Sequence, residues 1–145
     1  MSEIRPYAKS LNMLRNAKLR PTRQRLALTK LLFDAGNRHV TAEELHEDAV
    51  ANGVRVSLAT IYNTLHQFTV AGLLREVMAT SDKSYFDTNV APHHHFFVED
   101  ENCLIDIPDD QIDIASLPSA PEGTEISSVD VVIRLISTTQ KQDVN

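Results

Sequence analysis

The sequence predicts an α+β fold in two parts, a helical part at residues 1–89 and a strand-rich part at 92–145. Helix-type spacing of apolar residues with capping residues marks the first part, and short strand-type segments follow the last helix. The 145 residues, of which 42% are apolar, suffice for one compact domain or two small ones. Asn89 to Pro92 has the composition of a hinge between the parts.

Four helices are expected before residue 72. The first spans Tyr7 to Lys18, and the second runs from Arg23 to about Ala35 behind Thr22 as its cap. Thr41 with Glu44 forms a capping box for the third, which ends at Asn52. Ser57 caps the fourth, which reaches about Ala71. Its expected buried stripe consists of Leu58, Ile61, Leu65 and Phe68.

Two strands are expected next, Leu73 to Met78 and Ser84 to Asp87, joined by a polar turn over 79–83. Helices followed by a two-stranded hairpin form a winged helix-turn-helix. In that arrangement the helix from Ser57 to Ala71 lies in the DNA major groove. The first part is therefore predicted to bind double-stranded DNA.

Four residues are candidates for DNA contact: Arg20, Thr60, Tyr62 and Asn63. Thr60 and Tyr62 could contact base edges, and Asn63 could pair bidentately with adenine. Arg20 could reach a phosphate or a narrow minor groove. The alternatives are a core aromatic ring for Tyr62 and plain solvation for Asn63 and Arg20.

The charge distribution agrees with a polyanion partner for the first part. Residues 1–80 carry 11 basic and 7 acidic side chains, whereas 81–145 carry 3 and 13. Eight basic and no acidic residues lie between Ile4 and Phe33. A basic region suits nucleic acid, although two solvated helix faces would have the same composition.

The second part is predicted to form a homodimer. Strands are expected at His94–Glu99, Cys103–Ile107 and Val129–Ile136, with at most two helical turns within Asp109–Ala115. Three short strands bury too little apolar surface to be stable alone. A second copy would complete the core and would suit palindromic DNA. Cys103, the only cysteine, is expected to be a small core residue.

Three consecutive histidines, His93, His94 and His95, are the main candidates for ligand binding. Alternation along a strand would place His93 and His95 on one face and His94 on the other. This pattern fits two different sites or one haem with a choice of axial ligands, and Phe96 and Phe97 could cover a porphyrin. His46 and His66 are weaker haem candidates. No positioned general base accompanies the cluster, so an enzyme is not expected.

Several stretches resemble the ferric uptake regulator family: Leu19–Arg25, His39–Leu45, Leu58–Leu65, Ala71–Leu73 with Phe68, and His93–His95. The resemblance implies a winged-helix DNA-binding domain, an α/β dimerisation domain and a regulatory metal site at His39, Asp87 and His95. A further acidic ligand falls on Asp113. The paired cysteines of a structural zinc site are absent, so no structural zinc is expected.

The triple histidine resembles the iron response regulator branch of that family. This implies a cytoplasmic, dimeric regulator, mainly a repressor, of iron and haem metabolism genes, with haem bound at His93, His94 and His95. Its partner would be a palindromic, A/T-rich DNA operator. The alternatives are a sensor of Fe²⁺ or Mn²⁺ at His39, Asp87 and His95, a metalloenzyme, and a haem-storage module. No apolar run reaches the ~18 residues of a membrane span.

Overall fold

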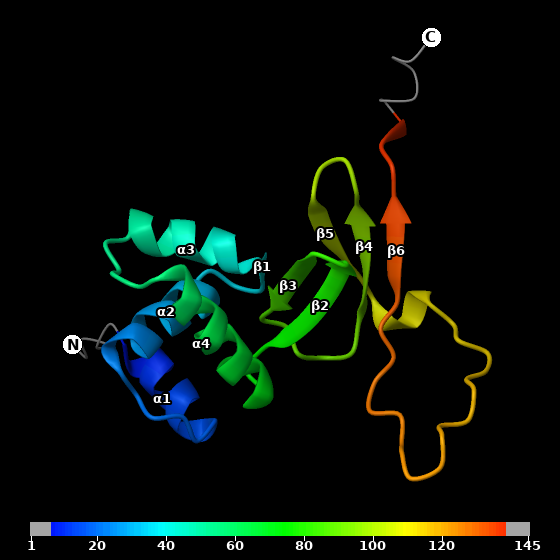
Figure 1. The fold of residues 1–145 in the computed structure, drawn as a ribbon, viewed down its shortest axis with the longest axis horizontal. Helices are drawn as coiled ribbons and strands as arrows, with labels where there is room; N and C mark the ends of the chain where they lie inside the picture. Colours follow the sequence, from blue (N-terminus) through cyan, green and yellow to red (C-terminus); the bar gives the residue numbers. More distant parts are fainter. Residues whose placement is uncertain (1–6, 139–145) are drawn as a thin grey trace. The chain divides into compact units, whose positions relative to one another are not determined.

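The computed structural model describes residues 7–138, and these form two compact units that divide after Val90 (Figure 1). Helices dominate the first unit and strands the second, so the predicted α+β class is confirmed. None of the helices between residues 7 and 138 combines the length and apolar character needed to cross a membrane.

From residue 7 onward, the first unit contains four helices, as predicted. They are α1 (Ala8–Asn16), α2 (Arg23–Phe33), α3 (Ala42–Ala51) and α4 (Leu58–Val70). The three predicted caps are present, because the side chains of Thr22, Thr41 and Ser57 each accept a hydrogen bond from the backbone N–H three residues on. Each bond satisfies a donor that the first helical turn leaves free.

A three-stranded antiparallel sheet in the order β1-β3-β2 completes the first unit (Figure 1). It contains β1 (His39–Val40), β2 (Arg75–Thr80) and β3 (Lys83–Asp87). The hairpin turn is shorter than expected, because β2 and β3 extend to Thr80 and Lys83. Strand β1 was not predicted, since two residues are too few to show an alternating pattern.

The core of the first unit lies between the helices and one side of this sheet. Leu28, Leu45 and Phe68 are fully buried there, together with Leu74 and Phe86 from the sheet region. The predicted stripe of α4 is correct at Ile61, Leu65 and Phe68 but wrong at Leu58, which is 36% exposed. Leu58 is the first residue of the helix, and the core covers the stripe only from Ile61 onward.

The second unit is built on the sheet β5-β4-β6, in which β5 is antiparallel and β6 parallel to the central β4 (Figure 1). The strands are β4 (His94–Val98), β5 (Cys103–Ile107) and β6 (Val132–Leu135). A single 3₁₀ turn at Asp109–Gln111 lies within the segment for which at most two helical turns were predicted. Cys103 is exposed rather than buried, because the inward positions of β5 are Leu104 and Ile107.

Candidate functional site

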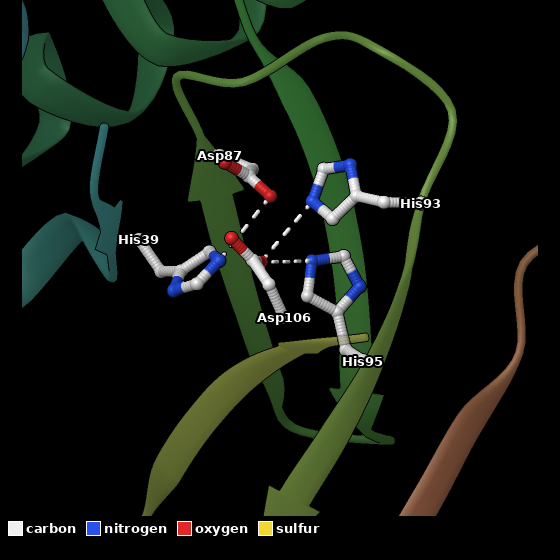
Figure 2. Close-up of side chains that lie close together, drawn as sticks. All are labelled: His39, Asp87, His93, His95 and Asp106. Carbon is white, nitrogen blue, oxygen red and sulfur yellow. Dashed lines mark ion pairs between the residues drawn. The ribbon is translucent and has the colours of Figure 1, made fainter. Parts of the chain in front are cut away.

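A histidine and a buried carboxylate form an ion pair at the end of the sheet in the first unit. His39 of β1 lies opposite Asp87 of β3 in the strand register, and its Nε2 is 3.3 Å from Asp87 Oδ2 (Figure 2). Asp87 is only 1% exposed, and its Oδ1 accepts a hydrogen bond from the backbone N–H of Asn89 at 2.9 Å. A buried carboxylate requires such compensation, from donors or from a cation.

A second group of ligand-type side chains lies in the second unit, where two imidazoles converge on one carboxylate oxygen. The Nε2 atoms of His93 and His95 lie 3.2 Å and 3.3 Å from Asp106 Oδ1 (Figure 2). His95 in β4 is paired directly with Asp106 in β5, and His93 is two residues earlier on the same side. Their ring centroids are 4.5 Å apart, and both histidines are buried.

The tautomer of His93 determines what its Nε2 atom presents to Asp106. His93 Nδ1 lies 2.6 Å from the carbonyl oxygen of Ala91, and a carbonyl only accepts, so Nδ1 carries the hydrogen. In a neutral ring Nε2 then points its lone pair at the carboxylate of Asp106. Two facing lone pairs require a cation between them, either a proton or a metal ion.

These donors fit a divalent metal ion. Metal-binding histidines commonly donate the other ring N–H to a backbone carbonyl, as His93 does to Ala91. The set comprises imidazole nitrogens and carboxylate oxygens without a thiolate, which suits Fe²⁺, Mn²⁺ or Zn²⁺. In the second unit, His93, His95 and Asp106 could hold such an ion, and His39 and Asp87 offer the same kinds of donor in the first unit.

His94 lies on the opposite face of β4 and has different partners, as expected for alternation along a strand. Its Nδ1 accepts a hydrogen bond from the backbone N–H of Val131 at 3.2 Å, so in a neutral ring the hydrogen is on Nε2. That atom lies 3.7 Å from Asp109 Oδ1. His94 therefore connects β4 to the residue that precedes β6.

The remaining predicted ligands belong to neither group. His46 is half-buried on α3, and Asp113 is exposed after the 3₁₀ turn. His66 is exposed on α4, where its ring meets Phe86 edge-on with centroids 5.9 Å apart. Asp106 was not predicted as a ligand, and His93 was predicted to bind haem but not a small ion.

The predicted DNA-contacting side chains of α4 have different environments. Asn63 is exposed and, among residues 7–138, its amide has no hydrogen-bond partner. Tyr62 is 40% exposed, which argues against a core role for its ring, and its hydroxyl donates to Glu43 Oε1 at 2.6 Å. Thr60 is half-buried, and its hydroxyl accepts a hydrogen bond from Ser57 Oγ at 2.9 Å.

The hydrogen bond between Tyr62 and Glu43 shifts the pKa of both side chains. It lowers the pKa of Glu43, with a smaller contribution from a backbone hydrogen bond. It also raises the pKa of Tyr62, because ionisation would remove the donated hydrogen next to a carboxylate. At neutral pH the pair is thus a neutral phenol that donates to a carboxylate.

The exposed side chain of Arg20 lies on a loop that is attached to α4. Arg25 on α2 donates from Nη1 to the carbonyl oxygen of Arg20 and from Nη2 to Gln67 Oε1, both at 2.8 Å. One guanidinium group therefore connects the backbone of the loop before α2 to the helix that carries Asn63. This connection fixes Arg20 relative to the exposed face of α4.

Comparison with known proteins places the chain in a family. The model of the ferric uptake regulator family matches residues 16–134. The ferric uptake regulation protein of Shigella flexneri is 35% identical over 101 residues, covering 69% of this chain and 68% of that protein. The peroxide-responsive repressor PerR of Staphylococcus saprophyticus is 34% identical over 104 residues, covering 72% and 70%.

Solved structures agree with the sequence matches. The ferric uptake regulator from Pseudomonas aeruginosa, solved with manganese, superimposes with a TM-score of 0.68 at 25% identity, covering 89% of this chain and 98% of that chain. The family consists of transcription regulators rather than enzymes. The length of the family match and the identity to these relatives show that this chain is a member of the ferric uptake regulator family.

Proposed function

We propose that the protein is a transcription regulator whose affinity for a DNA operator responds to a divalent metal ion. The observation that carries the metal part is the convergence of two buried imidazole nitrogens on one oxygen of Asp106. The ion would be held by His93, His95 and Asp106 together with His39 and Asp87, and Fe²⁺ and Mn²⁺ are the candidates. When bound, it supplies the positive charge that these donors require.

Chain connectivity supports the assignment of both groups of ligands to one ion. Only five residues separate Asp87 from His93, so an extended chain spans at most about 20 Å between them. A shared ion would restrain the relation between the DNA-binding unit and the second unit. It changes operator affinity only if it binds one arrangement more tightly. A coupling of ~1–3 kcal/mol corresponds to about 5–150-fold.

A second copy of the chain would complete the DNA-binding form. Ile105 and Ile133 flank Phe96 on one face of the β5-β4-β6 sheet, and they are 44% and 38% exposed. We assign this apolar face to a homodimer. A two-fold dimer would place two α4 helices in successive major grooves about 34 Å apart, on a palindromic, A/T-rich operator.

The Asn63→Ala variant tests the DNA part of the proposal. Wild-type protein with Mn²⁺ is expected to enrich a defined duplex from a random-sequence pool. Asn63→Ala should then bind that duplex about 5–150-fold more weakly, because a bidentate adenine contact contributes ~1–3 kcal/mol of discrimination. Binding of random DNA should change little, since phosphate contacts dominate it.

The matched control for Asn63→Ala is Asn52→Ala, which replaces an exposed asparagine at the end of α3 rather than on α4. The side-chain amide of Asn52 donates to the carbonyl oxygen of Asp48, so the control should leave duplex preference unchanged. The DNA part of the proposal fails if wild-type protein enriches no sequence. An equal loss on selected and random duplexes would show that Asn63 only positions α4.

Haem sensing through His93, His94 and His95 is the second candidate. It is favoured by the run of three histidines, which resembles the iron response regulator branch, and Phe96 and Phe97 could cover a porphyrin. The two candidates place different demands on His94. A small ion held beside Asp106 does not use His94, because His94 lies on the opposite face of β4, where its Nδ1 accepts the hydrogen bond from Val131. A haem that can take any of the three histidines as an axial ligand does use His94.

Replacing His94 with alanine separates the two candidates. The variant is expected to bind Mn²⁺ within a few-fold of wild type and to lose about 1 kcal/mol of stability, because one hydrogen bond to the backbone is removed. Calorimetric titration with Mn²⁺ and thermal unfolding measure both effects. If haem gives wild type a saturable Soret band that the variant loses while Mn²⁺ binding persists, haem sensing is supported instead.

A further inference from the structure

We propose that Glu43 determines the base preference of Tyr62, so that it is a positioning residue for operator recognition. This inference rests on the proposed function, because it assumes that α4 contacts base edges. Glu43 lies in the first turn of α3 and Tyr62 on the exposed side of α4. Their side chains, 19 residues apart in sequence, share a hydrogen bond of 2.6 Å.

The hydroxyl group of Tyr62 has a single hydrogen. Tyr62 can donate one hydrogen bond, and Glu43 accepts it. The hydroxyl oxygen therefore offers only its lone pairs to a neighbouring molecule. In the major groove it can accept from the amino groups of adenine or cytosine. It cannot donate to guanine or to the O4 of thymine.

The carboxylate of Glu43 also restricts the ring itself. Tyr62 is 40% exposed, so packing alone leaves its hydroxyl end free, and the hydrogen bond to α3 fixes the direction in which the phenol points. The negative charge lies in the first turn of α3, where the partial positive charge of the helix N-terminus offsets it. The hydrogen bond between Tyr62 and Glu43 can therefore persist when α4 lies against the negatively charged DNA.

Without Glu43 the hydroxyl would be free to rotate. It could then act as donor or acceptor, and the variant would accept all bases at the position under Tyr62. Glutamine at position 43 would retain an acceptor oxygen for the phenol while removing the charge. The series Glu43→Gln and Glu43→Ala therefore separates the role of the hydrogen bond from that of the charge.

The experiment measures base preference at every position of a duplex enriched by the wild-type protein in the presence of Mn²⁺. Glu43→Ala and Tyr62→Phe should each reduce discrimination at the same base pair by about fivefold or more. The double variant should be no worse than either single variant, because both remove one interaction. Glu43→Gln should retain most of the wild-type preference.

Glu47→Ala is the matched control, since it removes an exposed carboxylate from the same helix. If Glu43→Ala strengthens binding to all duplexes equally, as Glu47→Ala would by charge alone, the inference is wrong. If Glu43→Ala keeps the wild-type base preference while the wild-type protein still enriches a defined duplex, the inference fails but the proposed function does not. If wild-type protein enriches no sequence, the inference and the proposed function both fail.

A DNA-free measurement tests the hydrogen bond directly. The ultraviolet absorbance of the protein is followed as the pH is raised. Subtracting the curve of Tyr62→Phe from that of wild type gives the absorbance change due to ionisation of Tyr62. In Glu43→Ala, compared with Glu43→Ala/Tyr62→Phe, the pKa of Tyr62 should fall toward its ordinary value, because the carboxylate that raises it is removed. An identical ionisation of Tyr62 with and without Glu43 would contradict the inference.

Discussion

Replacing His95 with alanine is expected to lower the affinity of the metal-free protein for Mn²⁺ by at least about 100-fold. Loss of a hydrogen-bond partner of a metal ligand already costs 10–100-fold in other sites, and loss of the ligand itself should cost more. His95 is 1% exposed, so no water or neighbouring side chain readily replaces its nitrogen. Equilibrium dialysis or calorimetry measures the affinity.

The same variant should lose the stabilisation that the ion provides. A ligand at 100 times its Kd stabilises the folded state by about 2.7 kcal/mol, so Mn²⁺ should raise the Tm of wild type but not of His95→Ala. The control is His46→Ala, which removes a half-buried histidine from α3. Binding by His95→Ala within tenfold of wild type would rule out His95 as a ligand.

The fold could be predicted largely because its signals are local. Thr22, Thr41 and Ser57 each lie directly before a helix, and each cap needs only the next three residues. The apolar period of α4 identified Ile61 and Phe68 as core residues in the same way. These features depend on backbone geometry within one or two turns, so the sequence alone contains them.

The features that could not be predicted depend on contacts between distant segments. Strand β1 exists because two residues pair with β3, almost fifty positions later. The segment from 112 to 131 has no helix or strand, and β6 is limited to the four residues that pair with β4. Alternating residues such as Val129 and Val131 predict a longer strand, but the pairing partner decides its length.

Asp106 lies beside the histidines because of the register between β4 and β5, and a difference of one residue would move it away. If the strand ended at Glu99, as expected, pairing with Cys103 would place His95 opposite Ile107. In the structure Val98 pairs with Cys103, which places His95 opposite Asp106. A shift of one residue exchanges the two faces of a strand, so the carboxylate could not be assigned to the histidines without the observed pairing.

Replacing Phe68 with alanine is expected to destabilise the first unit by about 3–5 kcal/mol. Phe68 is fully buried among the core residues, and such truncations lose both transfer free energy and packing around the cavity that remains. Because helices dominate this unit, its unfolding can be followed by far-UV circular dichroism during urea denaturation. The loss would be a large share of the 5–15 kcal/mol that stabilises a typical domain.

Val70→Ala is the matched control, because Val70 is on the same helix and 91% exposed. It should change stability by no more than about 0.5 kcal/mol, and equal effects of the two variants would contradict the burial of Phe68. The comparison also separates folding from recognition on α4. Phe68 points into the core while Tyr62 and Asn63 are exposed, so Phe68→Ala should reduce operator binding only in proportion to the unfolded fraction, with base preference unchanged.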